Sequence, residues 1–313
     1  MRQTLSMVGW VLLLSFLYGS TMVASRFSVG QYDPRTYISL RLLLASGIHI
    51  AVYLFSKQRE WPKDKKLWLY SIGLGIGGTL IPMTAMVSSL QYQSTGVTAM
   101  LITLTPAMTV LMAHFFLEDE FLSWRKAIGV IVALCGAALL LVRGETGLAE
   151  LAQADWRGYA WALSGMIAGA ASGIYARRYL RHADAWDVTS IRMFSAAATL
   201  STITYFTVGY EMDNVNLMGY GALLYATLTG TFLAMWLSFY IIKRYSATAA
   251  AQTSYAVPVI STTLGAFLLN EQVTSGMLVG MAIIVVGIAL INWQPRQLGQ
   301  YSRRMKSAGV LGN

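Results

Sequence analysis

The chain has 313 residues, of which 56% are hydrophobic and only 12% are charged. An average soluble domain has roughly 25% charged residues. These values exclude a water-soluble globular fold and an intrinsically disordered chain, and 28 Gly with 6 Pro exclude a collagen-like sequence. The single cysteine, Cys135, excludes a small disulfide-bonded scaffold. The composition therefore predicts a polytopic α-helical membrane protein.

Stretches of about 20 mostly apolar residues predict membrane-spanning helices. Ten such stretches follow one another along the chain, at about 7–27, 34–55, 67–90, 95–116, 124–142, 158–180, 187–208, 217–240, 247–269 and 275–293. All 14 acidic residues lie between these stretches or at their ends. The predicted fold class is all-α, a polytopic membrane protein of ten transmembrane helices.

The basic residues predict how these spans are oriented. If the N-terminus lies inside and the spans alternate, 17 of the 23 basic residues fall in inside segments and four fall in outside segments. Positive residues concentrate on the cytoplasmic side of membrane proteins, so both termini are expected in the cytoplasm. The net charge of +9 then needs no nucleic-acid partner. The basic tail, 294–313, is expected to contact anionic lipid of the bilayer.

The chain also contains an internal repeat with an offset of 151 or 152 residues. The matched pairs include Arg41 with Arg192, Glu120 with Glu271, Pro106 with Pro258, and Gly78-Thr79 with Gly230-Thr231. Each copy holds five predicted spans, an odd number, so the second copy must enter the membrane from the opposite side. We therefore expect two inverted five-helix repeats, an architecture by which transporters alternate access to a site between the halves.

The residues that close each copy are similar to those of a known family. The segment Thr95–Val142, which reads TGVTAMLITLTPAMTVLMAHFFLEDEFLSWRKAIGVIVALCGAALLLV, resembles the closing half of an EamA domain of the drug/metabolite transporter superfamily. Ala247–Ile291 repeats it, with Pro258, LLNEQVT, Gly280 and Gly287. The resemblance extends over nearly the whole chain, and it implies a carrier of the bacterial inner membrane. Similar proteins are often exporters of amino acids or other metabolites.

The repeat and the resemblance divide the chain into four parts. We expect a first EamA repeat at 1–143, an external connecting loop at 144–157, a second EamA repeat at 158–293 and a cytoplasmic tail at 294–313. One chain with two repeats completes the pathway by itself, so a monomer is expected, with a dimer as the alternative.

Polar and aromatic side chains near the middle of the spans are the candidate substrate contacts, because polar groups in hydrocarbon need partners that a wet cavity supplies. These residues are Tyr18, Thr21, Thr79, Thr84, Thr231, Trp236, Gln252 and Tyr255. The alternative for each Thr is a hydrogen bond to its own helix, and for each aromatic residue an ordinary packing role. As a set they predict an uncharged, aromatic, hydrogen-bonding cavity for a small-molecule substrate.

Two prolines fall near the middle of spans four and nine. Pro106 and Pro258 each remove a backbone hydrogen bond and leave carbonyls free to face a cavity. The functional interpretation is a kink that shapes or gates the substrate path. The alternative is a static kink that packing tolerates.

Two arginines lie inside spans, where a charge is costly and indicates function. In the predicted topology Arg41 shares the outer half of the membrane with Glu271, and Arg192 shares the inner half with Glu120. Two equivalent charge pairs between the repeats are therefore one hypothesis. The alternative is that each Arg reaches its interface while each Glu caps the next helix.

The sequence lacks the groups that other functions need. It has no carboxylate in mid-membrane, no HExxH or GxSxG motif, and only three scattered His. We therefore expect no enzyme, no metal site and no cofactor. The expected function is export or facilitated transport of small neutral or zwitterionic metabolites, such as amino acids. The alternatives are a proton-coupled exporter of multiple drugs or organic cations, which usually needs a membrane carboxylate, and a passive channel.

Overall fold

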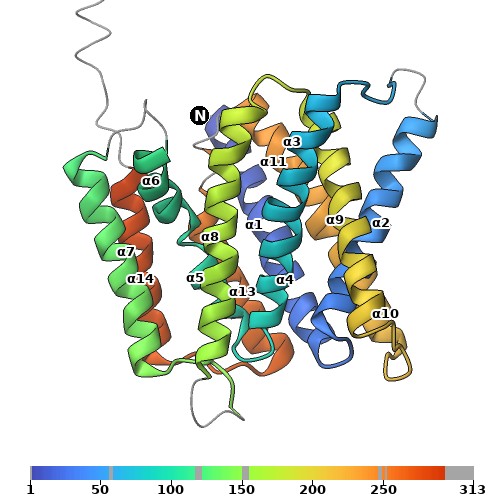
Figure 1. The fold of residues 1–313 in the computed structure, drawn as a ribbon. Coiled ribbons are helices and arrows are strands. Elements are labelled where there is room, and N and C mark those ends of the chain that lie inside the picture. The colour runs from blue at the N-terminus through green and yellow to red at the C-terminus, as the bar shows by residue number, and fades with distance from the viewer. Residues whose placement is uncertain are drawn as a thin grey trace, which may run out of the picture.

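The computed structural model describes residues 2–55, 59–116, 122–149, 155–245, 249–250 and 252–292. Within these ranges the chain is helical and contains no β-strand. The helices stand side by side as a bundle, with their axes roughly aligned (Figure 1). In this part of the chain seven helices are long and apolar enough to cross a membrane. The prediction of an all-helical, multi-pass membrane protein is therefore confirmed.

The first half of the chain forms helices that match the predicted apolar stretches. They are α1 (Arg2–Val29), α2 (Pro34–Phe55), α3 (Lys65–Gly75), η1 (Ile76–Leu80), α4 (Ile81–Ser89), α5 (Thr95–Ile102), α6 (Thr105–Phe116) and α7 (Trp124–Arg143). The segment η1 is a π-helix that continues α3 into α4. A two-residue break at 103–104 separates α5 from α6, and Pro106 is the second residue of α6.

The second half repeats much of this pattern. Its helices are α8 (Trp156–Tyr179), α9 (Ala185–Thr207), α10 (Leu217–Tyr225), η2 (Ala226–Leu233), α11 (Ala234–Arg244), α13 (Thr253–Leu269) and α14 (Ser275–Asn292). A second π-helix, η2, joins α10 to α11 at the position equivalent to η1. Pro258 differs from Pro106, because it lies inside the continuous helix α13. Pro106 therefore lies just after a break in its span, whereas Pro258 lies inside a helix.

Short polar residues set where several helices begin. The side chains of Asp64, Ser94, Ser123, Asp155 and Asp184 each accept a hydrogen bond from a backbone N–H in the first turn of the helix that follows. Such caps satisfy N–H groups that have no partner within the helix. This explains why acidic and hydroxyl residues gather between the apolar stretches.

The helices α7 and α14 form a tightly packed pair at one end of the bundle (Figure 1). Gly129 faces Gly287 and Gly136 faces Gly280, so the two helices run antiparallel. Small residues allow helix backbones to approach closely in a membrane. Other contacts also join the halves: α1 packs on α13, α2 on α9, and α8 on α4 and α6.

The surface of the bundle is rich in large apolar side chains. Val142 is 84% exposed, Phe206 is 79% exposed and Phe267 is 81% exposed. A monomeric soluble protein rarely leaves contiguous surface of this kind in water. The exposed apolar belt therefore fits a lipid environment.

Candidate functional site

A cavity of about 570 Å³ lies between the two halves of the chain. Helices α1, α2, α4, α5, α6 and α13 supply its walls. The lining residues are Tyr18, Thr21, Met22, Arg41, Met86, Ala99, Ile102, Thr103, Thr105, Pro106, Thr109, Val110, Thr253, Ser254 and Val257. This central cavity has the size of a site for a small organic molecule.

The structure brings some of the predicted site residues to the central cavity. Tyr18, Thr21, Arg41 and Pro106 line it. Pro106 follows the break between α5 and α6, so that break lies in the cavity wall. These four residues come from three helices of the first copy, α1, α2 and α6.

Other predicted site residues lie elsewhere. The Tyr255 hydroxyl donates to the Ile288 carbonyl oxygen on α14, and Gln252 is exposed at the start of α13. Thr84 Oγ1 is buried without a hydrogen-bond partner among the described residues, and Trp236 is 53% exposed. None of these four is among the residues that line the central cavity.

Arg41 bridges the two repeats through a neutral partner. Its Nε donates to Thr231 Oγ1 at 2.7 Å, and its Nη1 lies 3.4 Å from Ser25 Oγ. Arg41 is 4% exposed and Thr231 is 5% exposed. Because Thr231 lies in η2, this hydrogen bond ties α2 of the first copy to the π-helix of the second copy.

Arg192 makes the equivalent contact in the opposite direction. Its Nε donates to Thr79 Oγ1 at 2.8 Å, and its Nη2 donates to the Gly78 carbonyl oxygen at 3.2 Å. Thr79 and Gly78 lie in η1, where the wider π-helical turn alters the usual pairing of backbone groups. Thr231 and Thr79 thus hold the buried guanidinium group of Arg41 and the half-buried one of Arg192, respectively, instead of lining the central cavity.

The pairing of Arg41 with Glu271, one of the two hypotheses for these residues, is not made in this structure. Glu271 lies in the loop after α13, and its carboxylate accepts hydrogen bonds from Thr95 N at 2.9 and 3.1 Å and from Thr95 Oγ1 at 2.6 Å. Glu271 therefore caps α5 of the other repeat, not the next helix. Burial raises the pKa of the Glu271 carboxyl, while the Thr95 donors act in the opposite direction. Glu120, the partner of Arg192 in the same hypothesis, lies outside the described residues.

Most hydroxyl groups that line the central cavity already donate a hydrogen bond within the protein. Thr103, Thr105, Thr109 and Thr253 each donate to a backbone carbonyl oxygen of their own or the preceding helical turn. A hydroxyl that donates in this way can still accept a hydrogen bond. The cavity therefore offers one cation and several neutral acceptors to a ligand.

A second, smaller cavity of about 210 Å³ lies where α2, α9 and η2 with α11 meet. His49, Trp186, Phe232 and Trp236 supply aromatic walls. Trp236, which was predicted as a substrate contact, lines this cavity and stacks on Tyr240 with ring centroids 5.7 Å apart.

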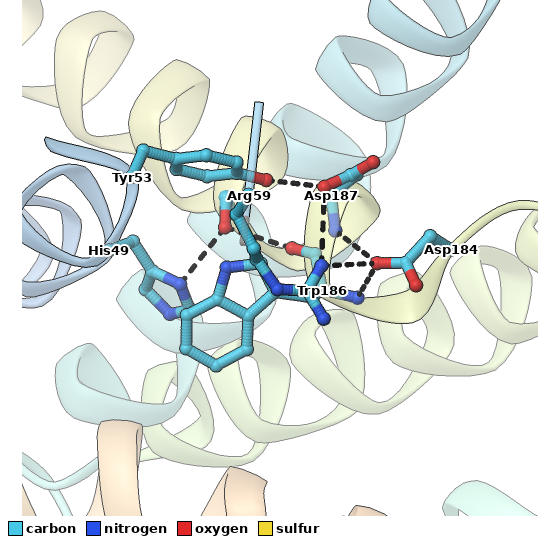
Figure 2. A network of polar contacts seen from close by, with 7 residues as sticks. His49, Tyr53, Arg59, Asp184, Trp186 and Asp187 are labelled. Atoms are coloured by element: carbon cyan, nitrogen blue, oxygen red, sulfur yellow. Dashed lines mark hydrogen bonds and ion pairs between the residues drawn. The ribbon is translucent and has the colours of Figure 1, made fainter. Parts of the chain in front are cut away.

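An ionic network borders the smaller cavity (Figure 2). Arg59 Nη1 lies 3.1 Å from Asp184 and 3.7 Å from Asp187, and its guanidinium lies 5.5 Å from the ring centre of Trp186. The Tyr53 hydroxyl donates to Asp187 at 2.5 Å. Burial acts to raise the pKa of Asp184, but the Asp187 N–H and Arg59 hold it below its usual value. The network joins the segment after α2 to the start of α9.

The sequence reasoning missed the two π-helices and the hydrogen bonds that they make with the arginines. A signal was present in the repeat. Gly78-Thr79 recurs as Gly230-Thr231 at an offset of 152 residues, and Arg41 recurs as Arg192 at an offset of 151 residues. The spacing alone does not reveal which span each Arg faces.

Comparison with known proteins agrees with the fold and the repeat. A model of the EamA-like transporter family matches residues 5–142 and 156–293. The chain is 22% identical over 284 residues to an uncharacterized transporter of Archaeoglobus fulgidus, covering 90% of this chain and 98% of that protein. It is 25% identical over 305 residues to the uncharacterized inner membrane transporter YedA of Escherichia coli strain K12, covering 96% and 93%.

A solved crystal structure supports the fold alone. It superposes with a TM-score of 0.61 at 20% identity, covering 95% of this chain and 97% of that one. The family match covers most of the chain, in two copies, and the relatives named above are transporters. The chain is a multi-pass membrane transporter that belongs to the EamA-like transporter family.

Proposed function

We propose that this transporter carries small neutral or zwitterionic metabolites, with aromatic or hydrophobic amino acids as the leading class, and that it is not an enzyme. The central cavity carries this proposal, because it lies between the halves and no carboxylate is among its described lining residues. An organic cation would need a negative partner in such an apolar place. A zwitterion instead finds one guanidinium and several hydroxyl acceptors there.

We further propose ten transmembrane helices in two inverted repeats that alternate access. The antiparallel contact of α7 with α14 supports this, since these helices close the two copies and equivalent helices of inverted repeats run in opposite directions. The hydrogen bonds of Arg41 with Thr231 and of Arg192 with Thr79 support it as well. Each joins the second span of one copy to the third span of the other.

The proposed location is the bacterial inner membrane, with both termini in the cytoplasm and the protein as a monomer. In this topology α6 ends and α13 begins on the cytoplasmic side. The cavity reaches Thr109 and Val110 of α6 and Thr253 of α13. The contacts of Glu271 with Thr95 lie at the opposite end. These positions support an inward-facing state.

Counterflow in liposomes tests the proposal. The purified protein is reconstituted, the vesicles are loaded with unlabelled phenylalanine, and a trace of labelled phenylalanine is added outside. We expect a transient accumulation of label that saturates with concentration and needs no pH gradient. Flux without counterflow would indicate a channel, and uptake of organic cations but not of any amino acid would contradict the proposed substrate class.

A further inference from the structure

Two guanidinium groups lie in the interior of this membrane protein without a negative partner in the described part of the chain. The ion pairs in that part involve other cations, namely Arg35, Arg59, Lys63 and Arg157. A buried charge is costly unless an opposite charge offsets it. The positions of Arg41 and Arg192 therefore require an explanation beyond hydrogen bonding.

The partners of Arg41 are all neutral. They are Thr231 Oγ1, Ser25 Oγ and the Tyr37 hydroxyl. Neutral oxygens satisfy individual N–H groups, but they supply no countercharge. A guanidinium has five N–H donors in a planar fork that matches a carboxylate.

Arg41 differs from Arg192 in its access to the central cavity. Arg41 is among the lining residues, whereas Arg192 is not. The described lining contains no Asp, Glu or Lys, so Arg41 is the only charged group among these lining residues. The lining hydroxyls that already donate to backbone carbonyls can act toward a ligand as acceptors. The chemistry of the cavity thus favours a ligand with one negative group.

We propose that Arg41 binds the carboxylate of the transported molecule and that the cavity selects small organic monocarboxylates. The carboxylate is the required group, because only Arg41 offers it an opposite charge. An ammonium group is not required, because the cavity offers that group only neutral acceptors. This inference rests on the proposed function in one respect, namely that the central cavity is the transport site.

Binding of five related compounds to the purified full-length protein tests the inference. Phenylalanine, N-acetylphenylalanine and 3-phenylpropionate have a carboxylate, whereas phenylalaninamide and phenethylamine have none. We expect the three acids to raise the thermal unfolding temperature in a saturable way, and the amide and the amine to have no effect up to about tenfold higher concentration. Equal binding of phenylalanine and phenylalaninamide, or no binding of any acid, would overturn the inference.

Variants of Arg41 connect the selectivity to this residue. Arg41→Gln is expected to weaken binding of 3-phenylpropionate about tenfold or more, and Arg41→Lys to weaken it less, since the charge remains. Arg125→Gln is the matched control, because it removes the same charge from an exposed position on α7. Elution of each variant as wild type in size-exclusion chromatography shows that it has folded. Unchanged acid binding in Arg41→Lys and Arg41→Gln would refute a role for Arg41.

The experiments separate this inference from the proposed function. If phenylalanine shows counterflow but its amide competes equally well, the proposed function stands and carboxylate recognition by Arg41 fails. If 3-phenylpropionate binds through Arg41 but no amino acid is transported, the inference stands and the proposed substrate class fails.

Discussion

The contact of α7 with α14 makes a quantitative prediction about stability. A Cβ atom added at Gly287 would lie 2.5 Å from Ala133 N and 2.7 Å from both Ala133 Cβ and the Gly129 carbonyl oxygen. Two of these three atoms belong to the backbone, so rotation of a side chain cannot relieve the clash. The helices must separate, and overpacking of this kind costs about 1–3 kcal/mol.

We therefore expect Gly287→Ala to lower the free energy of unfolding by about 1–3 kcal/mol. The assay is unfolding of the purified protein in mixed micelles with increasing sodium dodecyl sulfate. Gly173→Ala is the matched control, because a Cβ at Gly173 of α8 meets no atom within 4 Å. The reasoning would be refuted if Gly287→Ala unfolded at the same detergent fraction as the wild type, or if the control lost as much stability.

Two further predictions concern contacts between the repeats. Thr231→Val removes the acceptor of Arg41 Nε and should lower the free energy of unfolding by about 1–3 kcal/mol in the same assay, whereas no change would show that the hydrogen bond is replaceable. Glu271 has a folded-state pKa above its usual 4.5, so the folded protein binds this proton more tightly. The contribution of Glu271 to stability should therefore be fully present below pH 4.5 and be lost as the pH rises through the folded pKa. Glu271→Gln should lack this loss, and an identical pH profile in the variant would contradict the assignment.

Several helix boundaries were predictable, because apolar stretches end at residues that physically end helices. The predicted span 34–55 coincides with α2, which begins at Pro34 after Asp33. The predicted span 95–116 coincides with α5 and α6 together, although its break at 103–104 was not located. A proline in a span predicts a disturbance, but packing decides whether the helix breaks, as before Pro106, or continues, as through Pro258.

The candidate site was only partly predictable, because sequence spacing does not determine which neighbour a side chain faces. The sequence identified Arg41 and Glu271 as repeated charged residues, but it left open whether they pair with each other or serve as an interface anchor and a helix cap. In the structure Arg41 faces η2 from the other repeat, and Thr231 is the residue in reach. Glu271 turns toward α5, because the chain reverses at Asn270, which has φ of 53° in the left-handed region. The contact of Arg41 depends on how α2 is rotated about its axis, and that of Glu271 depends on the turn after α13. Sequence spacing determines neither.

The central claim is that the substrate occupies a cavity between the halves that is open to one side of the membrane at a time. Labelling of a single cysteine in that cavity tests this claim most directly. Thr109→Cys in a Cys135→Ser background places one thiol in the cavity wall. A membrane-impermeant maleimide is then added to the outside of two vesicle preparations. Right-side-out vesicles expose the outer face of the membrane to the reagent, and inside-out vesicles expose the cytoplasmic face. We expect labelling from the cytoplasmic side, and we expect a saturating concentration of a transported substrate to suppress it. Equal labelling from both sides, or labelling that no transported substrate changes, would contradict the account.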